Sequence, residues 1–567
     1  MKKINNLIKL VLVCGMVFIS SCETTNLDLT ENPNALTPDA ADPDFFLNAV
    51  QEDFARFVEN FGRTGSQLTR IAYMSGRDYT NAYSPAGMDG RWRSAYQGMG
   101  QDLQVMNVLA EEAGLNNHIA MGQVMQAYVI MTLVDFFGPV PYTEALLGSE
   151  NLNPVADSGD SVYAAAIGLL DSAIARFDDA SPDPQNDFFY DGDWDKWIKA
   201  ANTIKMKAYM ATRLVDGSAI ASFNAIVSSG NYISSSSEDF EFRWGTNEIQ
   251  PDTRHPAYSA TYGSTGAGRY QSNSLMDYMK GKTEYGYSSP WNFDPRTLFY
   301  FYRQVSATPG IAGAPANEET LECGLYIPPL HYSGFVYCGS TKGWWGRDHG
   351  NDNGIPPDGF LRALQGVYPA GGALDDLSYD SKKNGDGNGG NGITPIMLAS
   401  WSQFMIAEVQ MLTSPASAKT TVFDAINTSI DKVINFAPST DRFDWIFGTA
   451  DGGPAIALLS DYIYWFNLDL EADWDAGNDE DKWNIFAQQY FVAMFGNGID
   501  AYNFYRRTGY PTTLQPNIEP NPGGFIRSFL YPANYTNTNS NASQKSGVDI
   551  QVFWDTNPGS PGFPISN

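Results

Sequence analysis

Apolar residues recur every three or four positions along two long parts of the chain, which is the spacing of one face of an α-helix. In the first part this pattern predicts helices near 43–61, 99–110, 119–134, 162–177 and 194–211. In the last part it predicts helices near 397–412, 422–433, 483–494 and 499–507. The sequence therefore predicts a mainly α fold, in which successive amphipathic helices pack as hairpins.

The segment 217–396, between these two parts, shows no sustained helical period. It is rich in Gly, Ser, Asn, Pro and aromatic residues, and it contains one predicted helix at 274–280. Because a structureless loop of this length is not expected inside a compact protein, we expect loops, short strands and short helices laid over the helices. After the last helix, the Pro- and Asn-rich tail ends in a strand-like piece at 548–554.

The resulting expectation is a single domain over 42–567. Its expected parts are a helical scaffold over 42–216 and 397–510, an irregular ligand-binding region over 217–396, and an extended C-terminal tail over 511–567.

The first 21 residues have a different pattern, which is typical of a signal peptide. Three lysines come first, and an apolar run follows at 10–19. This run is too short to cross a bilayer, which takes a helix of about 20 residues. We therefore expect residues 1–21 to be removed.

The sequence Ile19-Ser20-Ser21-Cys22 resembles the lipobox of bacterial lipoproteins, in which the chain is cut before the cysteine and that cysteine receives acyl chains such as palmitate. An ordinary signal peptide with an incidental cysteine is the alternative. One acyl chain holds a protein only marginally, whereas two or three anchor it firmly. We expect residues 22–41 to form a lipidated flexible tether, and the lipid to be the only contact with the membrane.

The net charge of the chain excludes one class of binding partner. The formal net charge of −29 repels nucleic acid phosphates, so nucleic acid is excluded as a partner.

Apart from Cys14 and Cys22, the chain has only Cys323 and Cys338, and outside the cytoplasm we expect these two to form a disulfide. A metal site is the alternative, but no second Cys or His pair lies at zinc spacing.

Several motifs resemble, in the right order, those of SusD/RagB-type nutrient-binding outer-membrane lipoproteins. They cover nearly the whole chain after the lipobox: Leu27-Asp28-Leu29 to Asn32-Pro33-Asn34, Val134-Asp135-Phe136-Phe137-Gly138-Pro139, Trp197-Ile198-Lys199-Ala200-Ala201-Asn202, Ala501-Tyr502-Asn503-Phe504-Tyr505-Arg506-Arg507, and Arg527-Ser528-Phe529-Leu530-Tyr531-Pro532.

The resemblance implies a scaffold of helical hairpins similar to tetratricopeptide repeats, with an irregular insertion that supplies ligand surface. It also implies a cell-surface location on the outer membrane and a partner, a TonB-dependent SusC-like barrel, on which the lipoprotein sits as a lid. Strict 34-residue repeats are absent, so the residues alone predict only a helical scaffold.

The first candidate for ligand contact is the Gly-rich segment 343–358, with five residues: Trp344, Trp345, Arg347, Asp348 and Asn351. Adjacent indoles do not easily face one core, and the polar side chains beside them can hydrogen-bond hydroxyls or amides. The alternative is a structural loop, with Arg347 and Asp348 in an internal ion pair and one Trp buried.

The second candidate is the segment 77–83, because the early interhelical loop of the resembled family commonly meets ligand. Its candidate residues are Tyr79, Asn81 and Tyr83. The two tyrosines can equally pack on the helical scaffold.

No catalytic residue, cofactor or metal is expected. The sequence lacks Gly-x-Ser-x-Gly and His-Glu-x-x-His, and its four histidines are scattered. The calcium-like run 384–389 has Pro395 where a bidentate Glu belongs, so we interpret it as a solvated turn, as we do the acidic positions of 473–481. Acid pairs such as Asp348 with Asp352 leave glycoside hydrolysis open as an alternative.

The combined prediction is a surface lipoprotein that binds oligosaccharides and delivers them to a TonB-dependent transporter. High aromatic content, 14%, mildly favours sugar because rings stack on the apolar faces of pyranoses. The alternatives are the same role for oligopeptides, a lipid-anchored glycoside hydrolase, or a structural lid that touches no nutrient.

Overall fold

The computed structural model describes residues 42–263, 266–280, 294–309, 323, 327–340, 342–352, 361–365, 368, 375, 378–436 and 459–558. The predicted signal peptide, the tether and Cys22 lie outside these residues.

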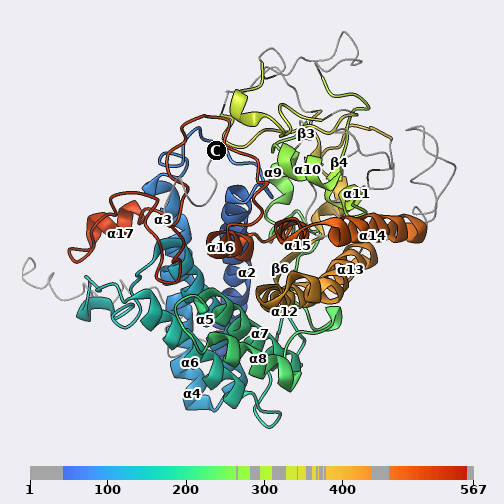
Figure 1. Cartoon of the computed structure of the whole chain (residues 1–567). Helices are drawn as coiled ribbons and strands as arrows, with labels where there is room; N and C mark the ends of the chain where they lie inside the picture. The colour runs from blue at the N-terminus through green and yellow to red at the C-terminus, as the bar shows by residue number, and fades with distance from the viewer. Residues whose placement is uncertain are drawn as a thin grey trace, which may run out of the picture.

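Antiparallel helices fill the N-terminal part of the chain (Figure 1). Their bounds are α2 (Pro43–Leu68), α3 (Pro85–Arg93), α4 (Gln101–Ala113), α5 (Asn116–Phe137), α6 (Gly159–Arg176), α7 (Trp194–Thr212) and α8 (Ala219–Ser229), with a π-helix, η3 (Ser94–Gly100), between α3 and α4. Neighbours in sequence pack together, α4 on α5, α5 on α6, α6 on α7 and α7 on α8. This is the expected succession of tetratricopeptide-like hairpins, and the predicted mainly α fold is confirmed.

The helical part continues through α8, which the Ser-rich sequence did not predict. Ala219 and Phe223 of this helix are buried, and the helix packs on α7.

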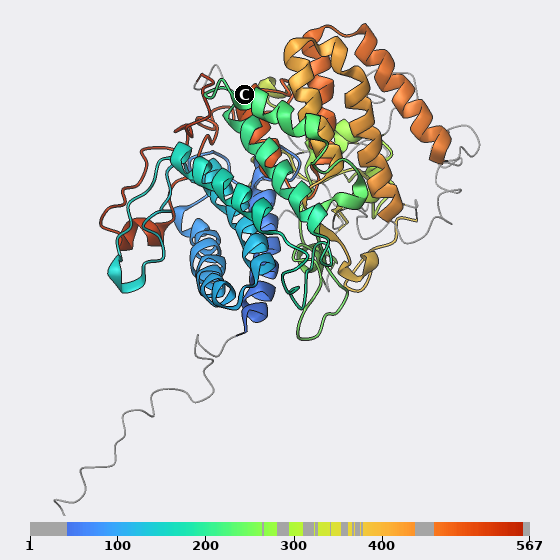
Figure 2. The ribbon, with the colours of Figure 1, turned by 90° about the horizontal axis from the view of Figure 1, so that it is seen from below.

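A second group of helices follows the irregular region. It consists of α12 (Ala399–Thr413), α13 (Lys419–Phe436), α14 (Leu459–Ala476), α15 (Asp479–Ala493) and α16 (Ile499–Thr508). In Figure 2 the gold and orange helices α12 to α15 lie to one side of the blue helices, while α16 packs on α2. The acidic positions interpreted as solvated turns lie instead at the end of α14 and in the first turn of α15, where acids favour the helix N-terminus.

Short elements make up the described parts of the irregular region, as predicted. The helices are α9 (Tyr258–Thr261), α10 (Asn273–Met279) and α11 (Thr297–Tyr300). Three antiparallel strand pairs are present: β1 (Phe240–Arg243) with β6 (Ile393–Met397), β2 (Tyr262–Gly263) with β3 (Gly266–Ala267), and β4 (Phe301–Tyr302) with β5 (Leu364–Gln365). The pair β1–β6 joins the two ends of the region, because Phe242 faces Thr394.

Local sequence explains where several helices begin and end. The side chain of Asp42 accepts a hydrogen bond from the amide of Asp44 at 3.1 Å and caps α2. A capping box starts α15, in which Asn478 and Asp481 each accept a hydrogen bond from the other's amide. Helix α5 stops at Gly138, whose φ of 80° favours glycine.

The apolar helix α5 lies at the centre of the N-terminal hairpins. It is long and apolar enough to span a membrane, but 89% of its most apolar window is buried inside the protein. Packing against α2, α4, α6 and α7 accounts for this composition. We therefore interpret α5 as the core helix of the scaffold.

The C-terminal tail packs across the core. It contains α17 (Ala533–Thr538), beside α3, and the piece 548–554 forms no strand, which corrects the sequence interpretation. Val548, Val552 and Trp554 of this piece are instead buried in the main core, whereas Ile550 is exposed, and Trp554 Nε1 donates to Asp135 Oδ1 at 2.9 Å. Asp135 also accepts hydrogen bonds from Tyr163 and Asn503, so this one carboxylate connects α5, α6, α16 and the tail.

Candidate ligand-binding site

The two adjacent tryptophans of the first predicted site are both buried, which corrects the expectation that they face a ligand. Trp344 is 2% exposed and belongs to the main core, where the guanidinium of Arg303 lies 4.6 Å from its ring centre. Trp345 is 0% exposed and packs in a separate small cluster with Val305 and Cys338. Each ring therefore contacts a different apolar cluster, and neither offers a stacking face.

The polar side chains of this loop also bond inside the protein. The guanidinium of Arg347 lies 4.1 Å from the ring centre of Tyr270. Asp348 accepts hydrogen bonds from Asn273 Nδ2 at 2.9 Å and from the amide of Cys338 at 2.7 Å. Arg347, Asp348 and Asn351 are all buried, so the loop is structural in its described part. Cys338 is bonded to Cys323, which is the disulfide that the sequence predicts.

Burial raises the pKa of Asp348 to about 6, even though hydrogen bonds from Asn273, Cys338 and Gln515 favour the carboxylate. Its ordinary value is 3.8, so the folded protein binds the proton more tightly than the unfolded chain does. The stabilisation from this proton is fully present below pH 3.8 and is lost as the pH rises through 6.

We expect Asp348→Asn to remove this pH dependence. Between pH 4 and 7 the free energy of unfolding of the parent should fall by about 2–3 kcal/mol more than that of the variant. Chemical denaturation at a series of pH values measures the difference. Asp352→Asn, at the neighbouring exposed carboxylate, is the control. Equal slopes for the parent and Asp348→Asn would contradict the assignment.

The second predicted segment is divided between core and surface. Tyr79 is 0% exposed, and its hydroxyl lies 3.0 Å from Arg70 Nη2 and 3.2 Å from His349 Nε2. Tyr79 is therefore a core residue and not a ligand platform. Tyr83 is half-buried and donates to Gln67 Oε1 at 2.9 Å, and Asn81 is exposed.

The structure brings the two predicted segments together. Arg77 and Asp352 form an ion pair at 2.5 Å on the surface, and the amide of Gly350 donates to Met74 O at 3.0 Å. Asp348 is buried while Asp352 is exposed and paired with Arg77, so these carboxylates do not form the acid pair of a glycosidase.

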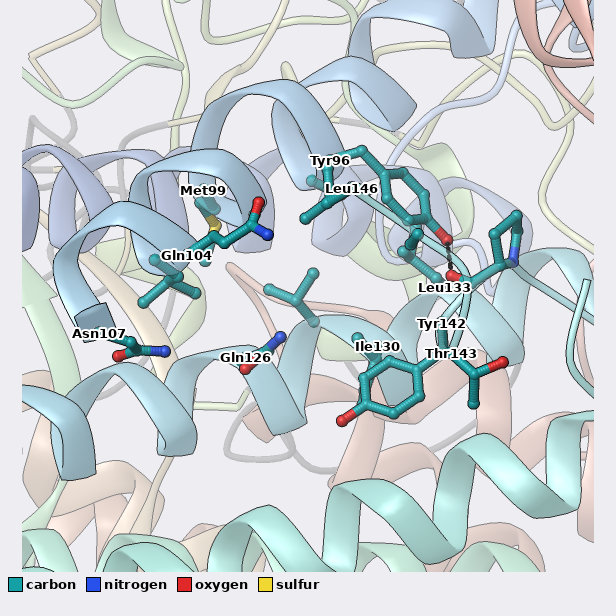
Figure 3. A pocket seen from close by; sticks show the side chains of 16 residues that line it. Tyr96, Met99, Gln104, Asn107, Gln126, Ile130, Leu133, Tyr142, Thr143 and Leu146 are labelled. Carbon is teal, nitrogen blue, oxygen red and sulfur yellow. Dashed lines mark hydrogen bonds between the residues drawn. The ribbon is translucent and has the colours of Figure 1, made fainter. Parts of the chain in front are cut away.

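A cleft of about 380 Å³, which the sequence did not indicate, lies between η3, α4, α5 and the loop 141–146 (Figure 3). None of the described side chains that line it is charged. Amides gather at one end and tyrosines at the other: Gln104, Asn107, Gln126, Tyr96 and Tyr142. Its size is typical of small-molecule sites, which span about 300–1,000 Å³.

Asp157 fixes the loop that closes the tyrosine end of the cleft. Its carboxylate accepts hydrogen bonds from the amides of Tyr142 and Thr143, at 2.8 and 2.9 Å, and from the Thr143 hydroxyl. Although partial burial opposes the charged form, these bonds, led by the one from the Thr143 amide, hold the pKa of Asp157 below its ordinary value. The same loop carries Leu146, and a Cβ on Gly100 would come within 2.8 Å of Leu146 Cδ1. Such a Cβ would also lie 3.0 Å from Ala95 O, so a larger residue at position 100 would require the Leu146 side chain to shift.

The polar groups of the cleft are only partly used inside the protein, where the Tyr96 hydroxyl donates to Pro141 O at 2.7 Å. Asn107 Oδ1 is buried and has no hydrogen-bond partner in the described part of the chain. A buried acceptor without a partner is costly, and rotation of the amide, whose nitrogen faces the cleft in Figure 3, would let a ligand hydroxyl satisfy it. The amides of Gln104 and Gln126 lie on facing helices beside it. The cleft thus combines ring faces with neutral donors and acceptors.

Metal binding has no structural support within the described ranges, where no group of three or more His, Cys, Asp or Glu residues could hold an ion. The calcium-like run lies in a turn around η9 (Gly387–Gly390).

Comparisons with known proteins identify the fold and the family. One family model, described as starch-binding and associating with the outer membrane, matches residues 33–314. A second, described as SusD and RagB outer membrane lipoprotein, matches residues 466–551. Together they cover more than half of the chain. No curated protein matches the sequence.

Solved structures give the same fold at low identity. A SusD/RagB family protein from Bacteroides thetaiotaomicron is 18% identical, with a TM-score of 0.60 over 91% of this chain and 100% of that one. A chitin-binding SusD homologue from Flavobacterium johnsoniae is 16% identical, with a TM-score of 0.56 over 90% of this chain and 99% of that one. The chain belongs to the SusD/RagB family of nutrient-binding outer-membrane lipoproteins, whose members bind ligands and are not enzymes.

Proposed function

We propose that this lipoprotein captures a neutral oligosaccharide at the cell surface and passes it to a TonB-dependent barrel of the SusC type. The observation that carries the ligand class is the charge-free cleft of Figure 3, with its tyrosines, its amides and the unsatisfied Asn107 acceptor. A sugar offers many hydroxyls and apolar ring faces but no charge. A free peptide brings charged termini, which this lining does not pair.

The expected affinity is modest. One sugar face on one ring contributes about 1 kcal/mol, and a neutral hydrogen bond contributes about as much. After ordering costs, a few such contacts give dissociation constants of about micromolar to millimolar. Such affinity suits capture followed by release into a transporter.

We expect Tyr142→Ala and Asn107→Ala each to weaken oligosaccharide binding by about fivefold, the equivalent of roughly 1 kcal/mol. Affinity electrophoresis finds the ligand among starch- and chitin-derived polysaccharides, with peptide mixtures in parallel, and calorimetry then measures each variant. Tyr464→Ala is the matched control, because Tyr464 is an exposed tyrosine on α14, away from the cleft (Figure 1).

If both cleft variants bind the oligosaccharide as tightly as the parent does, the cleft is not the ligand-binding site. Peptide binding without glycan binding would assign the oligopeptide alternative. A protein with no affinity for any probe would support the structural lid.

Asn81 and Tyr83 stay predictions for a second contact surface. Asn81 is exposed and half-buried Tyr83 is two residues away, so ligand can reach this loop without a change of fold. Measuring the affinity of the cleft variants and of an Asn81→Ala variant for the same glycan would show whether the cleft, this loop or both contact the ligand.

A further inference from the structure

A second, smaller pocket combines two arginines with a single acid. It lies where α2 meets the segment 255–269, with Tyr368 and Gly496 completing the wall. Its charged and titratable lining residues are Glu59, Arg63, His255 and Arg269. The volume is about 30 Å³, which is room for about two water molecules or one small polar group.

Neither arginine is directly bonded to an acid, although the charge of Glu59 acts on both. In the described residues, the guanidinium groups of Arg63 and Arg269 make no hydrogen bond and no ion pair, although both are mostly buried. The chain has 64 acids and only 35 bases, so carboxylate partners are abundant elsewhere. Two adjacent, mostly buried arginines that share one acid, Glu59, and make no direct bond to it are therefore an exception that needs a cause.

The burial of these two arginines disfavours their charged forms, so their pKa values are lowered. Burial, with repulsion from Arg63, lowers the pKa of Arg269 to about 10, although Glu59 opposes this change. Burial likewise lowers the pKa of Arg63. An anion between the two guanidinium groups would stabilise their charged forms and so raise the pKa values of both arginines.

The one acid of the pocket faces a histidine. Glu59 Oε2 lies 3.6 Å from His255 Nε2. His255 Nδ1 accepts a hydrogen bond from the amide of Ala257 at 3.0 Å, so the proton of the neutral ring is on Nε2, toward Glu59. Burial lowers the pKa of His255, which keeps the ring neutral at pH 7. With two arginines and one glutamate, the pocket is positive overall.

We propose that this pocket binds a carboxylate group, held between the guanidinium groups of Arg63 and Arg269. A planar carboxylate matches the fork of an arginine, and the volume excludes a whole sugar ring. The group is presented by an acidic sugar or by a small free carboxylate. The site is separate from the cleft and does not depend on the ligand of the cleft.

Thermal unfolding of the full chain in acetate, D-glucuronate, D-glucose and matched sodium chloride tests the proposal. A ligand at concentration c that binds only the folded state stabilises it by RT ln(1 + c/Kd), so the unfolding midpoint rises with the logarithm of the ligand concentration once that concentration exceeds the dissociation constant. We expect both carboxylates to raise the midpoint, and glucose and chloride to leave it unchanged. A stronger effect of glucuronate assigns an acidic sugar, and equal effects assign a free carboxylate.

Arg63→Gln and Arg269→Gln should each raise the dissociation constant for the carboxylate by about tenfold or more, because a charge-assisted hydrogen bond is lost. Without carboxylate these variants should unfold at or above the parent midpoint, since repulsion is relieved. Arg93→Gln, at an exposed arginine in the last turn of α3, is the matched control. No midpoint shift of the parent with either carboxylate, or an undiminished shift in the pocket variants, would overturn the proposal.

Discussion

Replacing Glu408 by glutamine lowers the free energy of unfolding by about 3–5 kcal/mol, because it leaves two nearly buried arginines without their counter-charge. Glu408 is 0% exposed on α12. Its carboxylate accepts two hydrogen bonds from Arg507 of α16, at 2.9 and 2.6 Å, and one from Arg213, just after α7, at 3.1 Å. One side chain thus links the N-terminal hairpins to α12 and α16 of the C-terminal group.

The pKa of Glu408 is shifted downward, which supports this expectation. Burial alone would raise it, but the charge and hydrogen bonds of Arg507, followed by those of Arg213, lower it below its ordinary value of 4.5. The carboxylate is therefore stabilised in the folded state. The stability that it contributes is present above pH 4.5 and is lost as the pH falls through the lower folded pKa.

Chemical denaturation at pH 7 measures the effect. Glu111→Gln is the matched control, because Glu111 is largely exposed in its ion pair with Arg176, at 3.1 Å. Exposed pairs contribute about 0–1 kcal/mol, so this control should unfold nearly as the parent does. A loss of under 1 kcal/mol in Glu408→Gln would show that water or rearrangement satisfies the arginines.

Most scaffold helices could be predicted from the sequence because each buries one apolar stripe. The stripe at 397–412 even contained Glu408, and a charged residue on an apolar face was a signal of a buried ion pair. The helix α14 was missed although buried Tyr462, Phe466 and Trp474 follow helical spacing. Further apolar and aromatic residues between them, such as Trp465, obscured the period.

The candidate site was less predictable, because burial depends on contacts between distant segments. The sequence shows that Trp344 and Trp345 are adjacent, but not that their rings pack in two different apolar clusters. The cleft gave no local signal, since Gln104, Asn107 and Gln126 are ordinary helix residues. It forms only through the packing of α4 on α5 and the closure of the loop 141–146.

Replacing Cys22, the predicted anchoring cysteine, should have the largest effect on function. We expect Cys22→Ala to leave folding and ligand affinity unchanged but to abolish retention at the outer membrane and nutrient uptake. The reason is that the lipid on this residue is the predicted membrane contact, and without acyl chains no comparable attraction holds a chain of net charge −29 to anionic lipids. Fractionation of expressing cells measures retention at the outer membrane, and binding assays on the released protein measure its ligand affinity.

Cys14→Ala is the matched control, because Cys14 lies in the predicted signal peptide and is removed before anchoring. It should be retained and support uptake like the parent. The tether of residues 22–41 spans at most about 70 Å when extended, so a lipidated chain can swing over a neighbouring barrel without leaving the membrane. Normal uptake by Cys22→Ala would mean that contact with the transporter alone holds the protein in place.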